Sequence, residues 1–129
     1  MATWQTRWKA ARDFWDLAEL AHDGQHDSQV ATNAILAAIA ANDAICMRLG
    51  RSQPKNQSHT EAVRDLTAAC RGTRFERAAA EHGRQLLALL RHKSAAQYNT
   101  SPLTADAVER ILTQSKRFIE WAETVIAAP

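Results

Sequence analysis

The chain has 129 residues, of which 46% are hydrophobic and 23% charged, and its formal net charge is +2. These values are ordinary for one soluble globular domain over residues 1–129, and the mild charge excludes a strong overall electrostatic footprint for nucleic acid. Only three prolines and four glycines occur, and alanine is abundant while β-branched residues are sparse, which favours helices over strands.

A stripe of large apolar residues near the start of the chain predicts the first helix. Its members recur at helical spacing: Trp4, Trp8, Ala11, Trp15 and Ala18. This pattern favours a core seam over a ligand platform. Gly24 follows the stripe and is expected to end the helix.

A second helix, rich in alanine, is expected to run to about Leu49. Either Asp27 or Ser28 can cap its start, because a short polar side chain can accept a hydrogen bond from the first turn. Gly50 is expected to end it. The small side chains should let neighbouring helices approach closely.

Two further helices follow a polar loop. Ser58 and Glu61 have the spacing of a capping box at the start of the third helix, which should stop near Gly72. The fourth helix should begin around Arg74 and run toward Tyr98.

The fourth and last helices carry additional markers. Gly83 lies inside the fourth pattern, where glycine costs about 1 kcal/mol relative to alanine, so we expect a close helix contact there. The last helix should follow a turn at residues 99–102, with Thr104 as its cap and Asp106 in its first turn. Five helices joined by short loops predict an all-α, antiparallel up-and-down bundle.

The cysteines and the first residues indicate a cytoplasmic protein. Cys46 and Cys70 lie inside helical patterns, which indicates reduced, buried thiols. Residues 1–4 do not form a charged segment followed by an apolar one, and no apolar run approaches about 18 residues. We expect no membrane segment, and no cofactor, since a Gly-rich phosphate loop and a cysteine pair at zinc spacing are both missing from the sequence.

Two segments carry a family resemblance. Residues 91–98 hold Arg91, the polar His92 and, seven positions after the arginine, Tyr98. Residues 39–44 place an Ala-Asn-Asp-Ala core in the second helix. With the order of helices along nearly the whole chain, these features resemble the HEPN domains (higher eukaryotes and prokaryotes nucleotide-binding), which are small helical bundles.

The resemblance implies a function. HEPN ribonucleases carry an Arg, a polar residue and then a His four to six residues after the Arg, often followed by a Tyr. Arg91, His92 and Tyr98 match this motif, whereas Ala96 stands at the His position. We therefore expect a catalytically degenerate HEPN-like module that binds RNA, a nucleotide or a partner protein. The resemblance also implies a homodimer, and a nucleotidyltransferase or an antitoxin as partner.

The expected binding groove joins polar and basic side chains. Asn42 and Asp43 interrupt an apolar pattern, so at least one should face inward or toward a groove, where a polar group needs a partner. Arg91 is the simplest partner, and such a bridge would fix the register between helices. The residues expected in the groove are Arg91, Tyr98, Asn42, Asp43, Arg84 and Lys93. The locally basic tract, residues 71–77 with Arg84, Arg91, His92 and Lys93, is either a solvated helix face or a phosphate-binding face.

Two other functions stay open. A metal-independent endoribonuclease needs a base for the 2′-hydroxyl proton and a cation for the phosphate. Here Arg77 or Arg91 could be the cation, and His82 or His92 the base. A purely structural helical adaptor would use its polar core residues only to set helix register.

A repeated His-Asp pair precedes the second helix. His22 and His26 are four residues apart, a spacing at which two histidines on one helix can bind a divalent metal. Gly24 lies between them and argues against a continuous helical face. Helix-end capping is therefore the expected role, and we expect no metal site.

Overall fold

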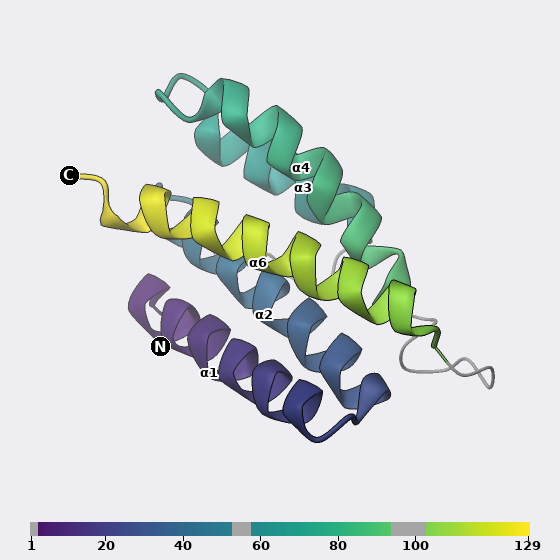
Figure 1. Cartoon of the computed structure of the whole chain (residues 1–129). Coiled ribbons are helices and arrows are strands. Elements are labelled where there is room, and N and C mark those ends of the chain that lie inside the picture. The colour runs from purple at the N-terminus through teal and green to yellow at the C-terminus, as the bar shows by residue number, and fades with distance from the viewer. Residues whose placement is uncertain (1–2, 53–57, 94–102) are drawn as a thin grey trace.

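The computed structural model describes residues 3–52, 58–93 and 103–129, and these residues form helices without any strand (Figure 1). The helices are α1 (Trp4–Asp23), α2 (Asp27–Arg48), α3 (His59–Cys70), α4 (Glu76–Leu90) and α6 (Ala105–Ala127). The predicted all-α class is confirmed for this part of the chain.

Helix α2 occupies the centre of the molecule. It packs against α1 on one side and α6 on the other, and the α3–α4 hairpin packs on α2 and α6 (Figure 1). Thirteen residues of α2 are buried and seven of these are alanine, so neighbouring helices can approach it closely. Helix α1 lies at the edge, with α2 as its main neighbour.

Helix α2 also has the length and composition of a membrane-spanning helix. The expectation based on uninterrupted apolar runs did not anticipate this, because polar residues are scattered along the helix. Inside the fold, 72% of its most apolar window is buried. Burial between α1 and α6 accounts for the apolar composition.

The residues predicted to form the core-facing stripe of α1 are of two kinds. Ala11 and Ala18 are fully buried in the core, while Trp8 and Trp15 are half-buried and pack against its edge. The core-seam interpretation is confirmed, with the alanines at its centre and the indoles along its margin.

Helix α2 begins at Asp27 and ends at Arg48, as predicted, but its capping residue differs from the prediction. His26 occupies the N-cap position without a side-chain capping bond, and Asp27 is already the first helical residue. Neither Asp27 nor Ser28 is therefore the cap. A cap at Asp27 requires Ser28 to be the first helical residue, whereas the helix already begins at Asp27. At the other end Gly50 has φ +92°, and the amides of Gly50 and Arg51 donate to Met47 and Cys46, a Schellman closure.

The caps predicted for α3 and α6 are confirmed. Ser58 accepts a hydrogen bond from the Glu61 amide at 3.2 Å, and Thr104 accepts one from the Ala107 amide at 3.1 Å. Each satisfies an amide that has no partner within its helix.

Helix α4 starts two residues after the predicted position, and it ends at Leu90, after which Arg91 interrupts the helical conformation that His92 and Lys93 resume. Thr73 holds the preceding turn, since its hydroxyl donates to the Cys70 carbonyl and accepts from the Phe75 amide. The regular helix therefore starts at Glu76 rather than Arg74. It ends at Leu90, the last buried residue of its apolar side, with Arg91 as C-cap. The rest of the predicted extension, from residue 94 to Tyr98, lies outside the described residues.

The contact predicted at Gly83 is confirmed. A Cβ atom added there would lie 3.1 Å from Val63 Cγ1, so glycine permits the close packing of α4 on α3. Ser115 adds an unpredicted tie between α6 and α2, because its buried hydroxyl donates to the Ala34 carbonyl at 2.7 Å.

Candidate functional site

Three arginines form an exposed row along α4, which we call the arginine stripe. Arg77, Arg84 and Arg91 are seven residues apart and all exposed. Seven residues are about two turns, so the three side chains leave one side of the helix at intervals of about 10 Å. The buried residues of α4 face the other way and are Ala79, Gly83, Leu86, Leu89 and Leu90. The pattern that buries the leucines thus turns the guanidinium groups outward.

Positive charge exceeds negative charge around the stripe. Residues 58–93 contain seven basic and four acidic side chains. Within the described ranges no ion pair closer than 4 Å involves any of the three arginines. The guanidinium of Arg74 lies 5.0 Å from the centre of the Phe75 ring, in a cation–π contact. The three guanidinium groups of the stripe are therefore exposed cations, and the exposed Glu81 carboxylate lies on the same side of the helix, four residues from Arg77 and three from Arg84.

His82 lies on the same helix but turns away from the stripe. Its ring stacks on Trp121 of α6, with centroids 4.5 Å apart and an interplanar angle of 11°. Burial lowers the pKa of His82, and the nearby Glu81 carboxylate opposes that shift. Arg77 is exposed, so the structure does not bring Arg77 and His82 to one site.

The other basic candidates follow the end of α4. Arg91 is exposed, whereas His92 and Lys93 are half-buried. Arg84 lies one heptad before Arg91, so these two predicted residues do share a surface. Tyr98, together with Ala96 at the expected His position, lies outside the described residues.

The two polar residues that interrupt α2 face inward, as predicted. Asn42 and Asp43 are buried. The Asn42 amide donates to the Ala62 carbonyl of α3 at 3.3 Å, and Asp43 Oδ2 lies 3.2 Å from Arg7 Nη2 of α1. The predicted bridge to Arg91 is wrong, because the basic partner comes from α1, which packs directly against α2.

This interior pair does not belong to the stripe. Its contacts join α2 to α3 and α1, whereas the stripe lies on the outer side of α4. The residues predicted for one groove therefore lie in two separate places. Asn42 and Asp43 form buried contacts between helices, and the arginines form an exposed cationic surface. Nothing in the local sequence around Arg7 of α1 indicated that its side chain would pair with Asp43.

The cysteines are buried and free, as predicted. Burial, reinforced by the nearby Asp65 and Asp43 carboxylates, raises the pKa of Cys46 to about 12, and burial raises that of Cys70 to about 11. Both thiols stay protonated near neutral pH, which makes them poor nucleophiles.

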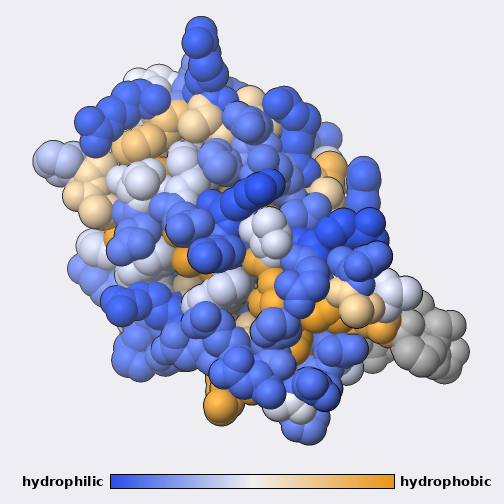
Figure 2. Space-filling view, in the orientation of Figure 1, coloured by the Kyte–Doolittle hydropathy of each residue, from blue (hydrophilic) through white to orange (hydrophobic). Residues whose placement is uncertain are grey.

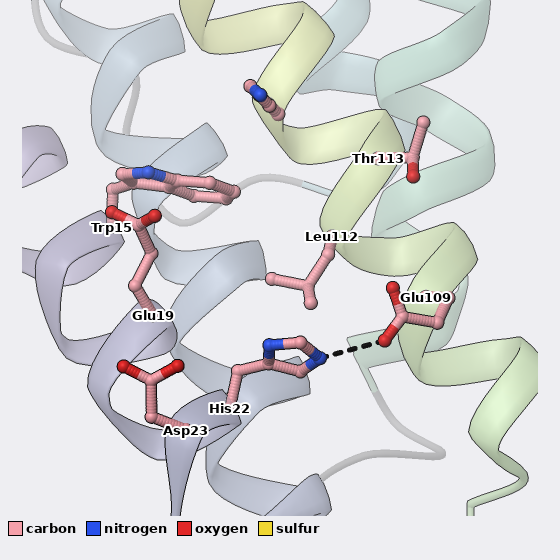
Figure 3. Close-up of a pocket in the computed structure, with 8 residues that line it drawn as sticks. Trp15, Glu19, His22, Asp23, Glu109, Leu112 and Thr113 are labelled. Atoms are coloured by element: carbon pink, nitrogen blue, oxygen red, sulfur yellow. Dashed lines mark hydrogen bonds and ion pairs between the residues drawn. The ribbon is translucent and has the colours of Figure 1, made fainter.

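A groove that the sequence did not indicate lies between α1 and α6, with a volume of about 280 Å³. Trp15 and Leu112 form its apolar walls, and His22 Nε2 lies 2.8 Å from Glu109 Oε1 across it (Figure 3). Hydrophilic side chains dominate the face of the molecule in Figure 2, and apolar surface appears in smaller patches between them and at the lower edge. His22 and Glu109 are 87 positions apart, so no local motif could predict their pairing.

The groove does not suit phosphate or a bound metal. Glu19 and Asp23 add carboxylates to its lining, so the acidic side chains there outnumber Lys116 and would repel an anion. His22 is paired with Glu109, while His26 sits at the start of α2. Across the described ranges no three His, Cys, Asp or Glu side chains gather as a metal site would need.

No family model matches the chain, and no curated protein matches it.

Proposed function

We propose that this chain is a HEPN-like, antiparallel helical bundle that binds RNA or a nucleotide through phosphate groups held by the arginine stripe. The observation that carries this proposal is the row of three exposed guanidinium groups, each without an ion pair in the described residues. Arginine binds phosphate oxygens through two parallel hydrogen bonds, which adds geometric specificity to charge attraction.

The sequence motif supports the same surface. Arg91, which matches the arginine of the HEPN motif, is also the last member of the stripe. Tyr98 follows it in the sequence and would add a ring on which a base can stack. Both features favour a nucleic-acid or nucleotide ligand over other anions.

Binding without cleavage is the favoured form of this function. Ala96 stands where the motif has its His, and His82 packs on Trp121 instead of beside the arginines. His92 directly follows Arg91 but is half-buried, so a phosphodiester held by the exposed guanidinium groups would have no exposed base beside it to remove the 2′-hydroxyl proton. The endoribonuclease alternative therefore becomes an outcome of the test.

The biological setting is part of the proposal. A HEPN-like module would be a cytoplasmic homodimer that works with a nucleotidyltransferase or within a toxin–antitoxin pair. That setting rests on the resemblance in residues 39–44 and 91–98.

The test measures binding of a labelled RNA oligonucleotide by fluorescence anisotropy at several salt concentrations. Replacing Arg77, Arg84 and Arg91 together by alanine should weaken binding at least about tenfold, because three phosphate contacts are lost. The slope of log affinity against log salt should fall by about 2 to 3 for the same reason. The matched control replaces three exposed cations of α6, Arg110, Lys116 and Arg117, and should bind like the wild type.

The competing functions give different results. Unchanged RNA binding in the stripe variant would overturn the proposal and leave the adaptor function. Total RNA incubated with the protein and EDTA should stay intact. Cleavage that disappears in His82→Ala or His92→Ala would instead establish the endoribonuclease.

A further inference from the structure

The groove between α1 and α6 is lined by one side of each helix. Trp15, Glu19 and Asp23 are four residues apart along α1, so their side chains share one side of it. Glu109 and Leu112 have the matching spacing of three residues on α6. Residues 15–23 rise about 12 Å along the helix axis, which sets the length of the groove on the α1 side.

The carboxylates on that side lie where the helix itself disfavours negative charge. Asp23 is the last residue of α1, and Glu19 lies one turn before it. The C-terminus of a helix carries a partial negative charge, and two carboxylates four residues apart repel each other. A cation in the groove would relieve both repulsions.

The other charges of the groove do not neutralise Glu19 and Asp23. Over the described ranges neither carboxylate has an ion pair closer than 4 Å. Glu109 is already paired with His22 at 2.8 Å. Lys116 also lines the groove, but it lies within 4 Å of no carboxylate in the part of the chain that the structure describes. The lining therefore keeps unpaired negative charge on its α1 side.

Apolar surface lies beside these carboxylates. Figure 3 shows the indole of Trp15 at one end of the groove, next to the Glu19 carboxylate, with Leu112 reaching in from α6. An aromatic ring attracts a cation over its face, and Leu112 offers packing for methylene groups. The groove therefore suits a cation that carries apolar carbon, whereas a bare metal ion would leave the apolar walls unused.

The size and charge of the groove restrict the ligand further. Its volume of about 280 Å³ is at or below the lower limit of drug-sized sites, roughly 300 Å³, so the ligand is small. Glu19 and Asp23 provide two unpaired carboxylates, and four residues of helix rise about 6 Å, a separation that a short alkyl chain can span. Alkyl amines are protonated near neutral pH, as the lysine side chain is.

We propose that the groove between α1 and α6 binds a small linear diamine in its diammonium form. One ammonium lies at Glu19 beside the Trp15 ring, the other lies at Asp23, and the methylene chain packs on Leu112. The site is separate from the arginine stripe, which lies on α4, so this inference does not depend on RNA binding.

Isothermal titration calorimetry on the full chain at low salt tests the site, with RNA left out because it binds amines itself. Putrescine, a four-carbon diamine, should bind saturably with one molecule per chain. Butylamine has the same carbon chain but one ammonium, and should bind roughly fivefold more weakly. Mg²⁺ carries the same charge as putrescine without its carbon and gives up its water reluctantly, so it should bind at least about tenfold more weakly.

Matched variants assign the binding to the groove. Glu19→Gln with Asp23→Asn keeps the shape of both side chains and removes their charge, and should weaken putrescine binding at least about tenfold. Glu61→Gln with Glu123→Gln makes the same change in net charge at exposed positions of α3 and α6, and should bind like the wild type.

Two single variants examine the walls of the groove. Lys116→Gln removes the opposing cation and should strengthen putrescine binding about twofold. Trp15→Leu keeps an apolar wall but removes the ring, and should weaken binding severalfold. Circular dichroism checks that each variant keeps the helicity of the wild type.

Four outcomes would overturn the proposal. The first is the absence of saturable putrescine binding. The second is Mg²⁺ binding as tight as putrescine binding, which would mean that charge alone is recognised. The third is an equal loss in the Glu19/Asp23 variant and in its Glu61/Glu123 control. The fourth is a lysine-rich peptide that binds through Glu19 and Asp23 while putrescine does not, which would make the groove a docking site for a basic protein segment.

Discussion

Two polar features interrupt apolar helical patterns in this chain, and the structure treats them in opposite ways. Asn42 and Asp43 of α2 point inward and are bound by α3 and α1. The arginines of the α4 stripe point outward and have no ion pair within the described residues. Both features belong to the groove expected from the sequence, yet only the second is available to a ligand.

A polar group that serves the fold and one that can serve a ligand differ in burial and in pairing. A buried carboxylate must have partners, because leaving it unpaired costs several kcal/mol. Its contacts therefore serve the fold first. An exposed cation gains little from surface pairing, so a row of unpaired cations on one helix does little for the fold and leaves the side chains accessible to a ligand.

The largest effect should come from breaking the interior pair. Asp43→Ala removes the carboxylate with which the Arg7 guanidinium pairs. The Arg7 side chain is 25% exposed. We expect a loss of about 2–3 kcal/mol in the free energy of unfolding, and a fall in melting temperature of roughly 10 °C. Urea titration and thermal melting monitored by circular dichroism measure both.

Two further variants check the cause of that loss. Asp43→Leu with Arg7→Met removes both charges and should recover part of the stability, since no unpaired ion is left. Lys9→Ala breaks the exposed pair with Asp13 and should cost less than about 0.5 kcal/mol. If Asp43→Ala is as stable as the wild type, Asp43 does not stabilise the packing of the helices. The prediction that it belongs to a ligand site would then be favoured.

Periodicity and capping were enough to predict most of the helices. The stripe of α1, the caps Ser58 and Thr104 and the close contact at Gly83 follow from interactions within a few residues, and the structure confirms them. The inward orientation of Asn42 also followed from its apolar surroundings.

Contacts between distant helices could not be predicted in the same way. Arg7 and Asp43 meet because α1 packs against α2, and many basic residues could have filled that role. The partner predicted for Asp43 was therefore wrong, although the need for a partner was clear. The groove between α1 and α6 was missed because His22 and Glu109 come together only in the folded chain.

His82 is an intermediate case, because it shares α4 with the arginines but faces the interior. Burial lowers its pKa below the ordinary value of 6.5, so the unfolded chain takes up a proton more readily than the folded chain. The contribution of His82 is fully present above about pH 6.5 and decreases as the pH falls toward the lowered folded-state pKa. His82 is half-buried, so solvent screens part of this shift and we expect a smaller effect than that of Asp43→Ala.

The comparison of urea midpoints at about pH 7.5 and about pH 5.5 measures this effect. His82→Phe keeps a ring against Trp121 but cannot be protonated, so its stability should fall less on acidification than that of the wild type. His59→Phe, at the start of α3, is the matched control and should leave the pH dependence unchanged. A His82→Phe variant with the full acid sensitivity of the wild type would contradict the assignment.

The smallest effect on stability should come from the stripe itself. Replacing Arg77, Arg84 and Arg91 by alanine removes no ion pair seen in the described residues and places a stronger helix former at each position. The free energy of unfolding should therefore change by less than about 0.5 kcal/mol in total, measured by the same urea titration. A loss of 2 kcal/mol or more would mean that these arginines support the fold. With stability unchanged and RNA affinity reduced, the stripe would differ from Asp43 in both properties, because a site kept for a ligand can be removed without cost to the fold that carries it.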